Sequence, residues 1–146
     1  MMKKYLPIVA GIVLGLLFVM ASTIYFLKLG PQPKFSEGSP PALFMGAFGP
    51  TGYMHFVKVF ELLGGVFVAM PRTRNFGLLV LGPIIVNIIA FHIFITSPKN
   101  WLDPMLVVII ALAMYLLWVG RKQFAGLLSG PTSRRGTEPE DRYGLR

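Results

Sequence analysis

Residues 76–97 read FGLLVLGPIIVNIIAFHIFITS and contain no Asp, Glu, Lys or Arg. A helix of this length rises about 1.5 Å per residue and is long enough to cross the ~30 Å hydrocarbon core of a bilayer. Residues 5–29 and 102–120 are two further long apolar stretches, and residues 53–70 form a shorter one that carries charges. We therefore predict an all-α membrane protein in which residues 1–130 form a four-helix transmembrane bundle.

The composition of the 146-residue chain also favours a membrane protein. Only 14% of the residues are charged, 54% are hydrophobic and the mean hydropathy is +0.65, whereas soluble domains carry about 25% charged residues. The net charge is +8, but the basic residues stand at the ends of the apolar stretches. That placement is typical of membrane topology, so we expect the lipid bilayer as a partner and no nucleic acid. The absence of cysteine excludes a disulfide or a thiol relay within this chain.

Residues 5–29 could be a retained helix or a signal peptide. Lys3 and Lys4 resemble a basic n-region, and residues 19–21 resemble a cleavage site. However, the apolar part of a signal peptide is about 7–15 residues long, and this run is longer. We predict a retained helix.

The segments outside the apolar stretches have different compositions. Prolines 31, 33, 40, 41 and 50 forbid a continuous helix in the long Pro/Gly-rich loop of residues 30–52. Within it, residues 42–48 (ALFMGAF) are apolar but too short to span a bilayer, so we expect them to lie at the membrane surface or to dip into the mouth of the bundle. Residues 131–146 are polar and charged without an apolar period, which predicts a disordered tail.

The distribution of Lys and Arg predicts the orientation of the bundle. Four spans would place both termini on one side of the membrane together with residues 72–74. That side would hold ten Lys and Arg residues against three on the other. Because positively charged loops stay in the cytoplasm, we predict that both termini are cytoplasmic and that the Pro/Gly-rich loop is on the outer side.

Three polar residues follow one another at intervals of three in the stretch 53–70: His55, Lys58 and Glu61. This spacing puts them on one helical arc of about 120°. The arc should face the bundle, because a charged side chain in lipid costs about 3 kcal/mol on insertion scales. Lys58 and Glu61 are also close enough along the helix to form an ion pair.

Asn87 and His92 bring further polar groups to the same depth, because residues 76–97 run antiparallel to residues 53–70. They lie about 140° apart around a helix, so one should face the stretch 53–70 and the other the first or fourth stretch. We predict a polar cluster in the outer half of the bundle and no comparable cluster in the inner half. Its ligand-binding candidates are Lys58, Glu61, Asn87, His92 and His55.

A purely structural interpretation of these residues stays open. The Lys58–Glu61 pair could lock helices together, Asn87 could be an interhelical hydrogen-bond clamp, and His55 could sit in head-group water. Gly11 with Gly15, and Gly64 or Gly65 with neighbouring small residues, form small-residue steps that are typical of close helix packing.

The residues alone identify neither a catalytic group nor a metal site. A haem held by two histidines needs facing imidazoles, and the depths expected for His55 and His92 differ by about 5 Å. The chain also lacks a flavin or nucleotide fingerprint. Electrons, if this protein moves them, would therefore belong to a bound redox molecule or to a partner subunit.

Two of the stretches resemble helices of the DoxX-like family. Residues 58–68 (KVFELLGGVFV), followed by Pro71 and Arg72, resemble that family's second helix, and residues 82–92 (GPIIVNIIAFH) resemble its third. The resemblance implies a small bacterial or archaeal inner-membrane protein linked to quinone-coupled redox chemistry and to complexes that answer oxidative or thiol stress. It also implies quinone as the candidate cofactor, with membrane redox subunits or further copies of the chain as partners.

Three functions stay open from the sequence. The first is an accessory or quinone-interacting subunit of a membrane redox or oxidative-stress complex. The second is a non-enzymatic assembly factor, chaperone or scaffold that uses residues 42–48 and the glycine faces as binding surfaces. The third is a small proton-linked transporter subunit in which Lys58 and Glu61 carry the proton.

Overall fold

The computed structural model describes residues 2–30, 34–96 and 103–128, and within these ranges it contains helices and no strand. The helices are α1 (Met2–Phe26), α2 (Pro40–Phe48), α3 (Tyr53–Ala69), α4 (Arg74–Phe94) and α5 (Pro104–Leu128). The all-α prediction is confirmed. The tail predicted at 131–146 lies outside the described residues.

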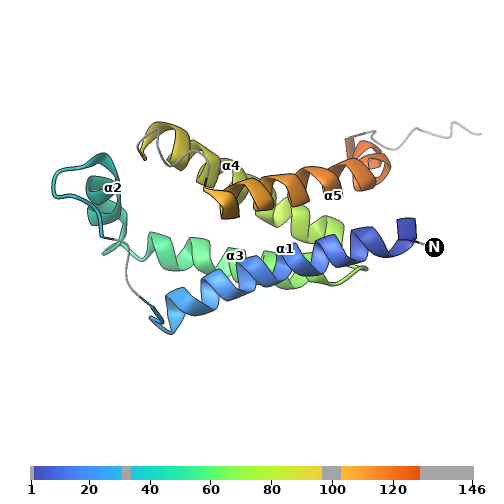
Figure 1. Cartoon of the computed structure of the whole chain (residues 1–146), viewed down its shortest axis with the longest axis horizontal. Coiled ribbons are helices and arrows are strands. Elements are labelled where there is room, and N and C mark those ends of the chain that lie inside the picture. Colours follow the sequence, from blue (N-terminus) through green and yellow to red (C-terminus); the bar gives the residue numbers. More distant parts are fainter. Residues whose placement is uncertain (1, 31–33, 97–102, 129–146) are drawn as a thin grey trace, which may run out of the picture.

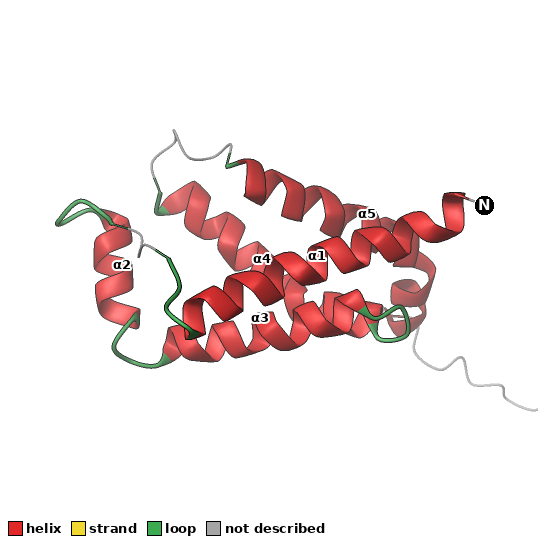
Figure 2. Cartoon of the chain, turned by 60° about the horizontal axis from the view of Figure 1, so that its bottom comes forward, coloured by secondary structure: helices red, strands yellow, loops and turns green. Residues whose placement is uncertain are grey.

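The four longer helices lie side by side, with neighbours in the chain running in opposite directions (Figure 1). α1 and α3 form one pair, α4 packs on α3, and α5 lies beside α1 and α4. The start of α1, the α3–α4 turn and the end of α5 gather at one end of the bundle, which we call the basic end. The short helix α2 stands across the opposite end, the α2 end (Figure 2).

Three helices, α1, α4 and α5, are long and apolar enough to cross a membrane. α3 has 17 residues and qualifies only together with α2, to which it is joined by a bend of 90°. The pair is therefore a broken span or a re-entrant segment by its length and composition. A helical membrane bundle is supported, while the exact number of four crossings stays a prediction.

Several helix ends differ from the prediction by two or more residues; α4, for example, covers Arg74–Phe94 instead of residues 76–97. Two of these differences have a clear local cause. α5 continues to Leu128 beyond the predicted end at residue 120, because Arg121, Lys122 and Gln123 end an apolar run but are good helix formers. α1 ends at Phe26 instead of residue 29. Lys28, in the turn that follows, adopts a φ of 53°, which does not continue a right-handed helix.

The prolines of residues 30–52 prevent a continuous helix through this loop, and two of them begin the short helix α2. Pro40 and Pro41 occupy the first turn of α2, where a missing N–H costs no hydrogen bond. The Ser39 side chain caps this turn by accepting a hydrogen bond from the Ala42 amide at 3.4 Å. Gly52, with a φ of 78°, then makes the corner into α3. The apolar piece predicted at 42–48 is thus helical and lies across the mouth of the bundle.

Glycines bring the helix backbones into direct contact, as predicted. A Cβ atom added to Gly15 of α1 would collide with the Gly65 carbonyl of α3, and one added to Gly65 would lie 2.9 Å from the Gly15 carbonyl. On the other side of α3, a Cβ on Gly77 of α4 would collide with the Val68 amide. These contacts enclose an apolar core whose most deeply buried members are Leu14, Phe18, Val68, Leu81 and Leu116.

Large apolar side chains cover the outside of the bundle. Phe94 is 81% exposed and Trp118 is 67% exposed, and many Leu, Val, Ile and Met side chains on all four long helices are exposed as well. Soluble monomers rarely carry such extended apolar surface. The outside of this bundle is therefore suited to lipid.

The Gly15–Gly65 contact leads to a test. Gly15→Ala should lower the free energy of unfolding by about 1–3 kcal/mol, the usual cost of overpacking a tight interface. Gly82→Ala is the matched control, because Gly82 also lies within a long helix but no atom would come within 4 Å of its new Cβ. Circular dichroism during denaturant titration in mixed micelles would measure both. Equal stability of the two variants would show that the contact is not tight.

Candidate functional site

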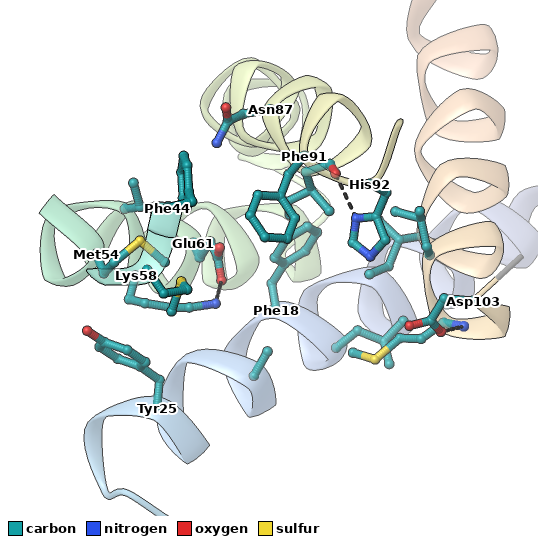
Figure 3. A pocket seen from close by; sticks show the side chains of 18 of the residues that line it. Phe18, Tyr25, Phe44, Met54, Lys58, Glu61, Asn87, Phe91, His92 and Asp103 are labelled. Carbon is teal, nitrogen blue, oxygen red and sulfur yellow. Dashed lines mark hydrogen bonds and ion pairs between the residues drawn. The ribbon is translucent and has the colours of Figure 1, made fainter. Parts of the chain in front are cut away.

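A cavity of about 400 Å³ lies toward the α2 end of the bundle (Figure 3). All five helices contribute to its wall, which is mostly apolar and includes Phe18, Phe44 and Phe91. The polar side chains on the wall are few, and they include four of the five predicted candidates. We call it the α2-end cavity.

The strongest polar feature of this cavity is the ion pair between Lys58 and Glu61. The Lys58 ammonium donates to the Glu61 carboxylate at 2.6 Å, with one helical turn between the residues. The Glu61 side chain is only 4% exposed and that of Lys58 is 20% exposed. The Lys58 ammonium also lies 5.9 Å from the centre of the Tyr25 ring on α1. The predicted pairing is confirmed, and it neutralises a carboxylate that would otherwise be buried as a bare charge.

His92 presents one ring nitrogen to the cavity in a fixed orientation. Its Nδ1 lies 2.8 Å from the Ile88 carbonyl oxygen. Because a carbonyl can only accept, Nδ1 carries the proton of that bond. The half-buried ring lines the cavity, so Nε2 is the atom left to meet a ligand or to take up a proton.

Asn87 and His92 face different neighbours, as the sequence predicted. His92 lies on the side where the chain enters α5, near Asp103 (Figure 3). Asn87 is exposed and also lines a separate apolar groove of about 380 Å³ between α3 and α4. The cavity and the groove share Tyr53, Val57 and Asn87. They therefore adjoin along this edge.

His55 is the one candidate that the structure leaves outside the cavity. It is exposed, one turn closer to the α2 end than Lys58, and does not line the cavity wall. Its ring packs edge-on against Tyr25 with the ring centres 5.3 Å apart, and its Nδ1 lies 3.4 Å from the Tyr25 hydroxyl. His55 lies on the same helical arc as Lys58 and Glu61, but of the three residues only Lys58 and Glu61 line the cavity.

Sequence reasoning missed two contributions to this site. Asp103 lines the cavity, while its carboxylate accepts a hydrogen bond from the Met105 amide at 2.9 Å at the start of α5. An Asp directly before a Pro is a recognisable helix-start signal that could have located it. Phe44 of α2 packs on Phe91 of α4 with ring centres 5.1 Å apart, so α2 contributes to the wall of the cavity. No local sequence pattern indicates that contact.

A second polar cluster lies at the basic end of the bundle, outside the apolar stretches to which the prediction of a single polar cluster referred. At the basic end, Arg74 and Asn75 of α4 and Gln123 of α5 line a second cavity, and the Asn75 side-chain amide donates to the Gln123 side-chain oxygen. These residues lie at or beyond the ends of the apolar stretches. A search confined to polar residues within those stretches does not find them.

Comparisons with known proteins give one relative and no family. An alignment of 80 positions, which covers 52% of this chain, gives 32% identity to the uncharacterized protein YwoB of Bacillus subtilis (strain 168). The chain spans about half the length of that relative. No family model matches the chain, and no solved structure matches it. The resemblance to the DoxX-like family therefore stays a prediction.

The buried pair permits a test of how much its two charges depend on each other. Lys58→Met should lower the free energy of unfolding by about 3 kcal/mol, because it leaves Glu61 buried without its partner. Glu61→Gln should cost about 1 kcal/mol, since Lys58 is partly exposed and its long side chain can reach toward the interface. The double variant Lys58→Met/Glu61→Gln should recover most of the loss. Denaturant titration of all four proteins would give the coupling, and strictly additive losses would contradict it.

Proposed function

We propose that this chain is a small DoxX-like protein of a bacterial or archaeal inner membrane that binds a quinone-type ligand, as an accessory subunit of a membrane redox or oxidative-stress complex. The observation that carries the proposal is the α2-end cavity. It combines an apolar wall with a small number of polar groups that converge from α3 and α4. Its volume of about 400 Å³ lies in the usual range for small-molecule sites, about 300–1,000 Å³.

The polar groups of the cavity fit the head of a quinone. A quinone ring is flat and apolar and carries carbonyl oxygens that accept hydrogen bonds. The Lys58 ammonium and the Asn87 side-chain amide are donors for such oxygens. Aromatic rings of Phe18, Phe44 and Phe91 supply flat apolar surface.

When bound, a quinone supplies two-electron, two-proton redox chemistry. In this cavity the carboxylate of Glu61 and Nε2 of His92 are positions that can hold or release the protons. The electrons would come from a partner subunit. The chain itself would bind and orient the ring and keep water from it.

The groove between α3 and α4 fits the remainder of such a ligand. It is lined by apolar side chains including Phe56, Phe60 and Ile84, and it adjoins the cavity at Tyr53, Val57 and Asn87. A ligand with its head near Lys58 could therefore extend an apolar tail past Asn87 toward the lipid. This arrangement favours an amphipathic ligand over a fully polar one.

The quinone proposal predicts which variants lose the ligand. Solvent extraction of the wild-type protein purified in a mild detergent should yield bound quinone. When the protein is purified under reducing conditions, Glu61→Gln and His92→Ala should retain at most about one tenth of the wild-type amount. Each weakens or removes an acceptor, the Glu61 carboxylate or Nε2 of His92, for a hydroxyl of the reduced ring, and a hydrogen bond to a charged group is worth about 1.5–3 kcal/mol. His55→Ala is the matched control and should retain the wild-type amount, since His55 lies outside the cavity.

The outcome that opposes the proposal is equally specific. Absence of quinone from every sample, with circular dichroism showing folded protein, would favour the assembly factor, chaperone or scaffold. Protein partners would then be sought by cross-linking. Proton uptake by wild-type proteoliposomes that Glu61→Gln abolishes, without bound quinone, would favour the proton-linked transporter subunit.

A further inference from the structure

The basic end of the bundle contains a second cavity, of about 420 Å³, which we call the basic-end cavity. The α3–α4 turn and the first residues of α4 form one wall with Arg72, Arg74 and Asn75. The last turns of α5 form the other wall, which includes Leu116, Val119, Gly120, Gln123 and Phe124. This cavity shares no lining residue with the α2-end cavity.

Arg74 is the unusual residue of this cavity. Its side chain is half-buried, and its Nε and Nη2 atoms are buried without a hydrogen-bond partner among the described residues. The guanidinium packs closely on α1, since a Cβ added to Gly11 would lie 2.7 Å from Nε. Burial of a cation without a partner is costly. Nη1 is not among these enclosed atoms, so it is the part of the guanidinium that can meet a ligand in the cavity, and an anion that accepted from it would offset the buried positive charge.

Among the described residues, the surroundings of Arg74 add positive potential and no acidic side chain. Glu37, Glu61 and Asp103 are the acidic residues of the described ranges, and none of them lines the basic-end cavity. Arg72 stands exposed on the rim. A ligand in this cavity would therefore meet two cationic side chains.

The uncapped start of α4 and the side chain of Gln123 provide further hydrogen-bond donors at the basic-end cavity. No side chain caps the start of α4, because the Thr73 hydroxyl instead donates to the Phe67 carbonyl at 2.9 Å. The positive end of the α4 dipole therefore points to this region. The Gln123 oxygen is already engaged by Asn75, which leaves the Gln123 NH₂ group to donate.

We propose that the basic-end cavity binds a phosphate group, with the Arg74 guanidinium as its main ligand. The arginine guanidinium pairs with phosphate oxygens by charge-assisted hydrogen bonds, which Arg74 can donate through Nη1. The phosphate can come from the head group of an anionic phospholipid or from free inorganic phosphate. The apolar wall of Leu116, Val119 and Phe124 would accommodate the start of an acyl chain, and basic pockets between membrane helices bind such lipids.

Titration of the delipidated full chain in detergent micelles would test the proposal. Phosphatidylglycerol, phosphatidylcholine and inorganic phosphate would be added separately, with the melting temperature and the dissociation constant as readouts. Stabilisation by phosphatidylglycerol alone supports a lipid as the source, and stabilisation by inorganic phosphate supports free phosphate. Equal binding of phosphatidylcholine and phosphatidylglycerol, or no binding of any of the three, would overturn the site.

Variants at the same end of the bundle separate this site from a general charge effect. Arg74→Gln should weaken binding by about 10- to 100-fold, the effect of losing a hydrogen bond between charged groups. Arg121→Gln is the matched control and should change binding less than twofold, because the Arg121 guanidinium is exposed over the Trp118 ring, 4.3 Å from its centre, and does not line the cavity.

A rim variant keeps the proposal testable if Arg74→Gln does not fold. Arg72→Gln changes an exposed side chain and should still weaken binding by a few fold, since it removes one of the two cations of the cavity. If Arg72→Gln and Arg121→Gln weaken binding equally, the phosphate is attracted by net charge and the assigned site is wrong.

Discussion

The close contact between the backbones of α1 and α3 at Gly15 and Gly65 is the constraint on which the rest of the bundle depends. Lipid tails are as apolar as leucine, so apolar side chains alone give membrane helices little reason to associate. Van der Waals contact between backbones supplies that reason where both side chains are absent. Gly77 provides a similar approach of α4 on the other side of α3. α3, the helix with the charged pair, is thereby held between two apolar helices.

The same contacts account for the position of the α2-end cavity. The glycine contacts lie at the middle of the bundle and toward its basic end, whereas Phe18, Tyr25 and Phe91 fill the interior toward the α2 end. Small residues draw the helices together and large rings keep them apart. Space therefore remains beneath α2, where the Lys58–Glu61 pair neutralises itself. At the opposite end, Arg74 has no such neighbour among the described residues.

Much of this arrangement could be predicted from the sequence because it depends on short-range patterns. The long apolar runs, the spacing of Lys58 and Glu61 and the glycine pairs each act within one helix or between adjacent ones. The pairing of Lys58 with Glu61 follows directly from a separation of three residues. The position of Asn87 and His92 on different sides of α4 follows equally from the helical angle between them.

The remaining features depend on contacts between distant segments or on the ends of helices. The packing of Phe44 on Phe91 decides that α2 covers the α2-end cavity, and no local pattern records it. His55 shares the helical face of Glu61, yet its depth places it beyond the interior. Arg74 and Gln123 are far apart in the chain and lie outside the uncharged core of the apolar runs. A hydropathy pattern identifies such residues only as the ends of apolar stretches. In the folded chain, Arg74 and Gln123 line the same cavity.

The apolar outer surface of the bundle has a consequence for how this chain can evolve. At outward-facing positions such as Val86 and Phe94, lipid requires only that a side chain be apolar. Leu, Ile, Val, Met and Phe are then interchangeable there, and mutations accumulate without harm to the fold. Selection instead acts on a few small or charged inward-facing positions. Two homologous proteins can therefore keep the same helical bundle at low sequence identity. Glycines and charged residues at matching positions are then better evidence of homology than the overall identity.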